Sequence, residues 1–230
     1  MTCSSLSSYI HVCGRRNPKL GECITESVIA LNEQLRVGIP ELDIPPVEPL
    51  FIDTVELANI QNFKAIGRNI TLFGLAKHII HSVDIKFTDD GGTVYIDCEF
   101  PDVRLKALYD VEARILVPIK GKGPITINTK NVKANVKLNF KIVKRGGVDH
   151  IYFSSMTTML TIKEFDVDFV AENFDKILQD AVTQALSSTH QEVLDVTKPN
   201  LEKAISERIL KIGNQMCKHF TYDELLPDRE

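Results

Sequence analysis

Two long stretches in which every second residue is apolar constrain the fold of this chain more than any other feature. In residues 105–117 the apolar positions alternate with charged ones such as Lys106, Glu112 and Arg114. In residues 132–142 they alternate with lysines and asparagines. This period is typical of β-strands with one dry face and one wet face. Because strands of this length must curl around something to bury their dry face, we expect a strongly curved antiparallel sheet.

The same alternation extends on both sides of these stretches, and we expect the sheet to occupy about residues 50–169. Glycine-containing segments at 89–92 and 145–147 predict hairpin turns between strands. The apolar residues just before 129–131 fall on the opposite parity from those that follow. This change predicts a β-bulge in that strand near residues 129–131.

Helical periodicity brackets the predicted sheet. Residues 5–37 carry apolar positions at helical spacing and end at Gly38–Pro40, a helix stop signal. A region of about 171–220 predicts a long amphipathic helix, broken or kinked near Pro199. We therefore predict one domain, residues 1–230, of the α+β class. In it, a long, highly curved antiparallel sheet wraps around one long C-terminal helix, with short N-terminal helices.

Composition excludes several classes of protein. With 43% hydrophobic and 25% charged residues, the chain is not expected to be disordered. Its net charge of -4 argues against a general nucleic-acid binder. No apolar run is long enough for a membrane-spanning helix. The start, Met1–Ser5, has no basic and apolar leader pattern. Either a leader was removed from this sequence or the protein is intracellular, and of the two we expect a mature or trimmed chain. Asn69-Ile70-Thr71 is a candidate site for N-glycosylation.

A search for catalytic and metal-binding motifs finds none. The chain has no nucleophile elbow, no zinc-protease helix motif and no glycine-rich phosphate loop. His78 and His81 are close in sequence, but they fall in a predicted strand without a carboxylate or cysteine at metal-ligand spacing. We expect no enzyme, no cofactor and no metal site.

The cysteines allow more than one pairing. Cys13 and Cys23 flank a short polar loop that could be closed by a disulfide, or they could be free thiols. Cys98 alternates with apolar residues and is predicted to pack as a small hydrophobic side chain, and Cys217 to do likewise. A Cys98–Cys217 bridge has no local support, and Cys3 is expected to be unpaired near the chain end.

The apolar interior could be a filled core or a ligand cavity, because pattern alone does not distinguish them. Tyr109 interrupts an apolar inward row and is a candidate polar contact for a ligand. Lysines of residues 120–144 predict either a solvated outer face or a face that docks on anionic membranes. The candidate cavity-lining residues are Phe63, Leu72, Val94, Ile96, Leu105, Ala107, Tyr109, Val111, Val132, Val136, Leu138 and Phe140.

Three segments resemble the insect takeout and juvenile-hormone-binding-protein family. The opening, Tyr9–Cys13 followed by Asn17–Leu20 and Cys23, is similar to the start of those proteins. The proline-rich segment Gly38–Leu50 matches theirs almost residue for residue, and Phe220–Pro227 is similar to their closing motif. The resemblance therefore spans essentially the whole chain.

This resemblance implies a tubular lipid-binding fold and a secreted, monomeric carrier. The implied ligands are juvenile-hormone-like terpenoids, ubiquinone-like molecules or fatty acyl lipids. It also implies a disulfide between Cys13 and Cys23. Because a second disulfide cannot be placed on Cys98 and Cys217, the takeout branch fits better than the hormone-binding branch. Takeout-like members are associated with feeding, circadian output and behaviour. Transient contact with a receptor is a further expectation, and lipid transfer at anionic membrane surfaces is the alternative function.

Overall fold

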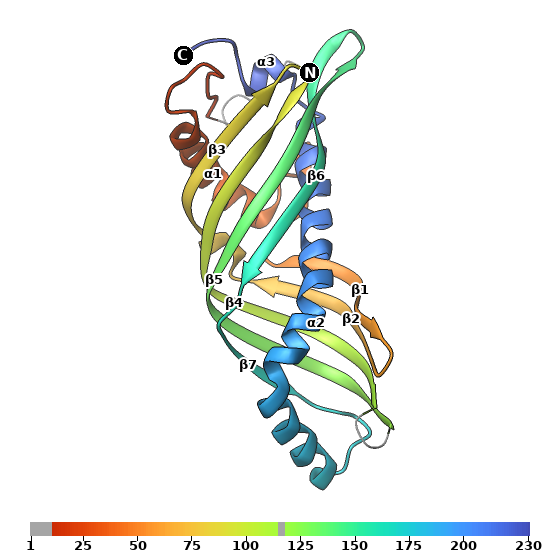
Figure 1. Cartoon of the computed structure of the whole chain (residues 1–230). Helices are drawn as coiled ribbons and strands as arrows, with labels where there is room; N and C mark the ends of the chain where they lie inside the picture. The colour runs from red at the N-terminus through yellow and green to blue at the C-terminus, as the bar shows by residue number, and fades with distance from the viewer. Residues whose placement is uncertain (1–10, 115–117) are drawn as a thin grey trace.

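A curved antiparallel sheet and one long helix dominate the computed structural model, which describes residues 11–114 and 118–230 (Figure 1). The predicted α+β class is confirmed, with the sheet curled into a half-barrel along the helix. The helices are α1 (Leu20–Val37), α2 (Lys176–Cys217) and α3 (Tyr222–Leu225), with 3₁₀ turns η1 (Pro40–Leu42) and η2 (Leu75–Lys77). The strands are β1 (Leu50–Ile60), β2 (Phe63–Phe73), β3 (Ile79–Thr88), β4 (Gly91–Arg114), β5 (Pro118–Arg145), β6 (Val148–Thr161) and β7 (Glu164–Phe169).

The two longest strands, β4 and β5, pair along their whole length and form the spine of the sheet. Toward one end, which we call the upper half as drawn in Figure 1, β3 pairs with β4 and β6 with β5. Toward the other end, the lower half, β2 pairs with β4, β1 with β2, and β7 with β5. The predicted turns at 89–92 and 145–147 join β3 to β4 and β5 to β6.

Both spine strands exchange their inward and outward faces at the same level. In β5 the inward residues are even-numbered above this level, as at Ala134, and odd-numbered below it, as at Ile127. The predicted bulge in one strand is wrong in form, because the pairing keeps one register from Phe100↔Val132 to Asp102↔Lys130. Asn131, with φ of 51°, lies opposite Pro101, so each strand contributes one reversing residue. The exchange of faces therefore leaves the pairing of β4 with β5 intact above and below Pro101 and Asn131.

The long helix α2 runs without a break through Pro199, so of the predicted break or kink the break is wrong. Pro199 lies inside the helix, where its missing N–H removes one backbone hydrogen bond. The Thr197 hydroxyl donates to the Val193 carbonyl at 2.7 Å in the preceding turn. Figure 1 shows α2 running along the open side of the sheet, with its N-terminal turns extending past the lower strands.

Side chains of α2 complete the hydrogen bonding of the exposed edge of β6. The Asn214 side chain accepts from the Phe153 N–H and donates to the Phe153 carbonyl, both at 2.8 Å. Farther along the same edge, the Leu160 N–H donates to Glu202 (2.6 Å) and the Leu160 carbonyl accepts from Lys198 (3.2 Å). An edge strand otherwise presents unpaired backbone groups to other chains. The helix therefore supplies hydrogen-bond partners to the open edge of β6 as well as covering it.

The N-terminal region is less helical than predicted. Residues 11–19 form loop and turns, and α1 begins at Leu20; residues 5–10 lie outside the described part. The helix ends at Gly38, whose φ of +87° favours glycine. A Cβ there would lie 2.8 Å from the Ile44 carbonyl oxygen, so the chain can fold back closely only at glycine.

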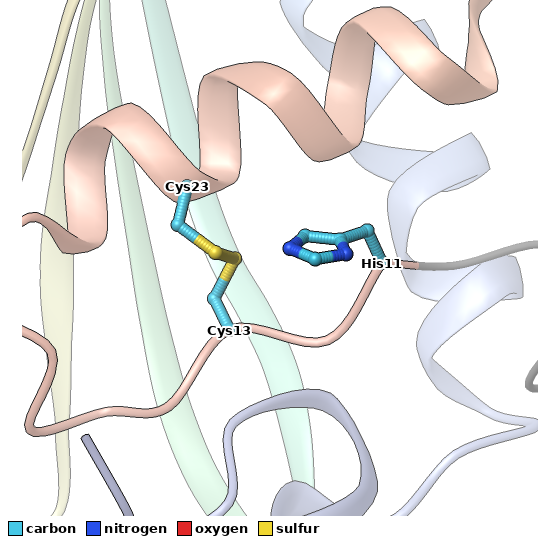
Figure 2. Close-up of side chains that lie close together, drawn as sticks. All are labelled: His11, Cys13 and Cys23. Carbon is cyan, nitrogen blue, oxygen red and sulfur yellow. A yellow bond between two sulfur atoms is a disulfide. The ribbon is translucent and has the colours of Figure 1, made fainter.

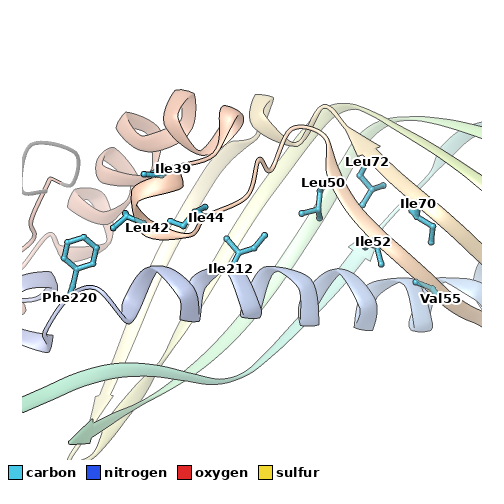
Figure 3. Close-up of a cluster of buried hydrophobic side chains, with 10 residues drawn as sticks. All are labelled: Ile39, Leu42, Ile44, Leu50, Ile52, Val55, Ile70, Leu72, Ile212 and Phe220. Carbon is cyan, nitrogen blue, oxygen red and sulfur yellow. The ribbon is translucent and has the colours of Figure 1, made fainter. Parts of the chain in front are cut away.

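The filled part of the interior lies between α2, β1 and the segment that follows α1 (Figure 3). A smaller cluster joins Phe140, Ile151 and Cys217 near the upper end of the half-barrel. Both clusters involve the C-terminal half of α2, and the larger one also includes residues of β1 and β2 in the lower half. The larger cluster consists of Ile39, Leu42, Ile44, Leu50, Ile52, Val55, Ile70, Leu72, Ile212 and Phe220.

Candidate ligand-binding site

The concave face of the lower half is apolar and incompletely covered. Along β4, the inward residues Leu105, Ala107 and Val111 are all partly exposed, although they face the inside of the half-barrel. Their outward neighbours, such as Lys106, are exposed on the convex face. Leu105 and Ala107 are covered in part by the larger core cluster, and the rest of their surface stays open to solvent. The lower wall therefore offers apolar surface to a ligand.

Small residues of this wall let other parts of the chain approach it closely. Tyr109 of β4 pairs with Gly67 of β2 on one side and with Gly123 of β5 on the other. Val111 similarly pairs with Ala65 and with Gly121. All four small residues are buried, because other parts of the chain lie over them: the Val170 carbonyl covers Gly123, and the Phe174 ring covers Gly121.

The twelve predicted cavity-lining residues divide into three groups. Leu72, Val132 and Phe140 are each 4% exposed and belong to the packed interior. Leu105, Ala107 and Val94 are partly exposed but pack against the core clusters. The remaining candidates face inward, keep partial exposure and lie outside both clusters: Phe63, Ile96, Tyr109, Val111, Val136 and Leu138.

Tyr109, the predicted polar contact, is already engaged with the chain. Its hydroxyl donates to the Val170 carbonyl at 3.3 Å, and its ring meets Phe169 edge-on with centroids 5.9 Å apart. Burial raises the pKa of this hydroxyl, with a smaller contribution from Glu172, so the group stays protonated at neutral pH. Tyr109 therefore ties the segment between β7 and α2 to the lower wall, in addition to lining it.

The Cys13–Cys23 pair forms a disulfide, with Cα atoms 5.9 Å apart, that fastens the N-terminal loop to the first turns of α1 (Figure 2). His11 lies beside it, and its ring and the two sulfurs fall within metal-ligand distances. A disulfide sulfur, however, is not the thiolate that binds a metal ion. The disulfide beside His11 therefore has a structural role, which is to hold the N-terminal loop against α1.

Cys98 and Cys217 are free and buried, in separate parts of the interior. The Cys98 thiol lies 3.7 Å from the Ala134 carbonyl oxygen, and Cys217 packs in the smaller cluster with Phe140. Burial raises the pKa of Cys98 to about 11 and that of Cys217 to about 12. The predicted packing role is therefore favoured over a Cys98–Cys217 bridge.

The remaining polar candidates lie apart from the concave face. His78 contacts the Leu75 carbonyl (3.0 Å), whereas His81 faces Glu99 at 3.4 Å on the edge of the sheet. Asn69 is exposed on β2, in an open position for the predicted glycosylation. A half-open groove of about 550 Å³ lies between α1 and the turn after β2, floored by Phe73 and bordered by charged side chains.

The lysines of β5 are exposed on the convex face. Lys133, Lys137 and Lys141 alternate there with asparagines. Acidic side chains share this face, since Glu99 lies directly across from Lys133 and Asp97 occupies the next outward position of β4. This mixture of signs is typical of a solvated surface. In the described part of the chain, no helix is both long and apolar enough to cross a membrane.

Comparisons with known proteins agree with this geometry. A family model described as haemolymph juvenile hormone binding protein matches residues 1–227. The circadian clock-controlled protein daywake of Drosophila yakuba is 23% identical over 216 residues, covering 88% of this chain and 82% of its own. A putative beta-carotene-binding protein of Schistocerca gregaria is 23% identical over 223 residues, covering 93% and 86%.

Among solved structures, Takeout 1 of Epiphyas postvittana shares the fold. Its TM-score is 0.81 at 19% sequence identity, and the match covers 94% of this chain and 99% of that chain. The long helix, the curled sheet and the N-terminal helix are thus common to both. Because the family model matches residues 1–227, nearly the whole chain, this chain belongs to the haemolymph juvenile hormone binding protein family.

Proposed function

We propose that this protein is a secreted carrier that holds one small hydrophobic ligand against the concave face of its sheet. The observation that carries the proposal is the row of inward apolar side chains on β4 that stays partly exposed. Burying about 350 Å² of apolar ligand surface there would contribute roughly 9 kcal/mol before the costs of association. Micromolar binding is therefore within reach of a preformed site.

The candidate ligands are those with a long apolar body and few polar atoms. Juvenile-hormone-like terpenoids, ubiquinone-like molecules and fatty acyl lipids meet this description, and the carotenoid named for the locust relative is a further example. Secretion is supported by the family description and by the Cys13–Cys23 disulfide, a bond that persists in oxidising compartments. A role in circadian behaviour has as its support the daywake relative of Drosophila yakuba, which is named a circadian clock-controlled protein.

Native mass spectrometry of gently purified protein tests carriage directly. We expect a mass increment from a bound isoprenoid or acyl lipid, released by organic extraction. Val136→Trp should reduce lipid occupancy severalfold, because the indole ring would fill the concave side next to Thr158. Lys137→Trp is the matched control, since the neighbouring position faces solvent. Equal occupancy in both variants, or wild-type protein that retains no lipid and takes up none, would contradict the proposal.

A further inference from the structure

Asn69 lies in a β-bulge of β2, where this strand exchanges its inward and outward faces. Gly67 is buried before this point and Ile70 after it, whereas Arg68 and Asn69 between them are both exposed. The pairing of β2 with β4 shifts register between Arg68 and Thr71. Asn69 itself has a left-handed backbone, with φ of 50°. The bulge therefore leaves the Asn69 side chain on the convex face of the sheet.

Thr71 completes the triplet Asn69-Ile70-Thr71, the only Asn-x-Ser/Thr triplet in the chain. Such a triplet is the acceptor for N-linked sugars in secreted proteins. The backbone alone accounts for an asparagine at this position, because Asn131 has the same conformation, with φ of 51°, and belongs to no such triplet. Support for a sugar at Asn69 therefore depends on what surrounds it.

Two large apolar side chains flank Asn69 on the convex face. Phe51 of β1 pairs with Thr71 and keeps 47% of its surface exposed. Leu108 of β4 pairs with Arg68 and keeps 45% of its surface exposed. Neighbours on one face of a sheet lie within reach of each other, including the diagonal ones at about 7–8 Å. Asn69 is thus placed between apolar surfaces that the described part of the chain leaves half uncovered.

The Phe51 ring is suited to pack against a sugar attached at Asn69. Since Phe51 is paired with Thr71, it lies diagonally across from Asn69. The first sugar of an N-linked oligosaccharide is a pyranose, which presents C–H groups on its ring faces. The face of an aromatic ring is electronegative and attracts such C–H groups. Their contact would also remove apolar surface of Phe51 from water.

We propose that Asn69 carries an N-linked oligosaccharide whose first sugar packs on Phe51. In its attachment, the Asn69 amide nitrogen forms a bond to the anomeric carbon of an oligosaccharide donated by a lipid diphosphate. The bond from that carbon to the diphosphate oxygen breaks, and the amide loses one proton. This inference rests on the secretion included in the proposed function. It adds a modification site and gives an exposed aromatic side chain a partner.

Expression of the full chain behind a secretory leader in cultured insect cells tests the attachment. Peptide-N-glycosidase A should lower the mass of the secreted protein by one oligosaccharide. Thr71→Ser should keep this mass change, because serine also completes the triplet. Thr71→Val should abolish it while keeping the asparagine and a side chain of similar shape. Secreted wild-type protein with no mass change, or an undiminished change in Thr71→Val, would overturn the site.

Thermal unfolding before and after digestion tests the packing on Phe51. Removing the oligosaccharide should lower the Tm of the wild-type protein by about 2–4 °C, as expected for exposing part of one aromatic ring. In Phe51→Thr the same digestion should change the Tm much less. Leu108→Thr is the matched control, since Leu108 is equally exposed and should leave the full effect. Equal losses of Tm in the wild-type protein and in Phe51→Thr would overturn the packing.

Lipid occupancy of the same samples separates this inference from the carrier function. Ile70, the residue between Asn69 and Thr71, is buried, so the oligosaccharide is attached on the side of the sheet away from the ligand. Digestion should therefore leave the amount of bound lipid unchanged, and a loss of lipid would overturn the assigned place of the sugar. Glycosylated protein that neither retains nor takes up lipid would contradict carriage and leave the Asn69 site confirmed.

Discussion

Replacing Asn214 with leucine should destabilise the protein by roughly 2–4 kcal/mol. The Asn214 amide makes two hydrogen bonds of 2.8 Å to the backbone of Phe153, where β6 has no neighbouring strand. Leucine has nearly the same shape but leaves both backbone groups without partners beneath α2. Each unsatisfied group costs about 1–3 kcal/mol, moderated here because the site is only partly buried.

Chemical denaturation followed by circular dichroism measures this loss, and thermal unfolding should show a decrease in Tm of roughly 5–15 °C. Asn214→Asp is expected to be intermediate, because a carboxylate still accepts from the Phe153 N–H but cannot donate to its carbonyl. Asn200→Leu is the control, since Asn200 is exposed and makes a single 3.0 Å bond to the Leu57 carbonyl. If Asn214→Leu cost no more than Asn200→Leu, the side-chain closure of the β6 edge would not contribute to stability.

Four other outcomes follow from the structure. Serine at both Cys13 and Cys23 should lower the free energy of unfolding by about 2–3 kcal/mol, the entropy of opening a short loop, and equal denaturation midpoints with and without the bond would refute this. Native protein at pH 8 should leave Cys98 and Cys217 unreactive toward a thiol reagent until it unfolds, because burial raises both thiol pKa values. Since the folded-state pKa values are the higher ones, stability should be constant below the unfolded thiol pKa and fall as pH rises from about 9 toward 11, which denaturation at fixed pH values would detect. Finally, the mixed charges of the convex face predict no salt-sensitive binding to anionic vesicles in co-sedimentation, and binding abolished by salt would restore the membrane alternative.

The sheet and the long helix could be predicted from the sequence because each is encoded in a local repeat. Alternation at 105–117 fixed a strand with one dry face, and apolar spacing around Pro199 required a helix. The continuity of that helix could not be predicted, because the sequence alone does not show whether tertiary contacts compensate for the backbone hydrogen bond that a proline removes. The reversal in β4 opposite Asn131 was missed for a related reason: its signal, Pro101, lies in a different segment from its partner.

The site was harder to predict than the fold. Periodicity identifies which residues face inward, but it does not report whether other side chains fill the space before them. Val132 and Val136 lie on the same inward face of β5, yet only Val132 is buried. The roles of Lys198 and Asn214 were also missed, because both depend on the edge of a distant strand; the only local signal was the i, i+4 spacing of Lys198 and Glu202.

The paired reversal at Pro101 and Asn131 has a consequence for how this chain tolerates insertions and deletions. Loss of either residue alone would shift one spine strand by one position, and the lysines of the lower wall would replace its apolar residues inside the tube. Removing both would keep β4 and β5 paired, but their apolar face would lie inside at one end of the half-barrel and outside at the other. Length changes are thus tolerated at the turns and not at mid-strand, where both Pro101 and Asn131 are needed to keep the apolar face inside along the whole half-barrel.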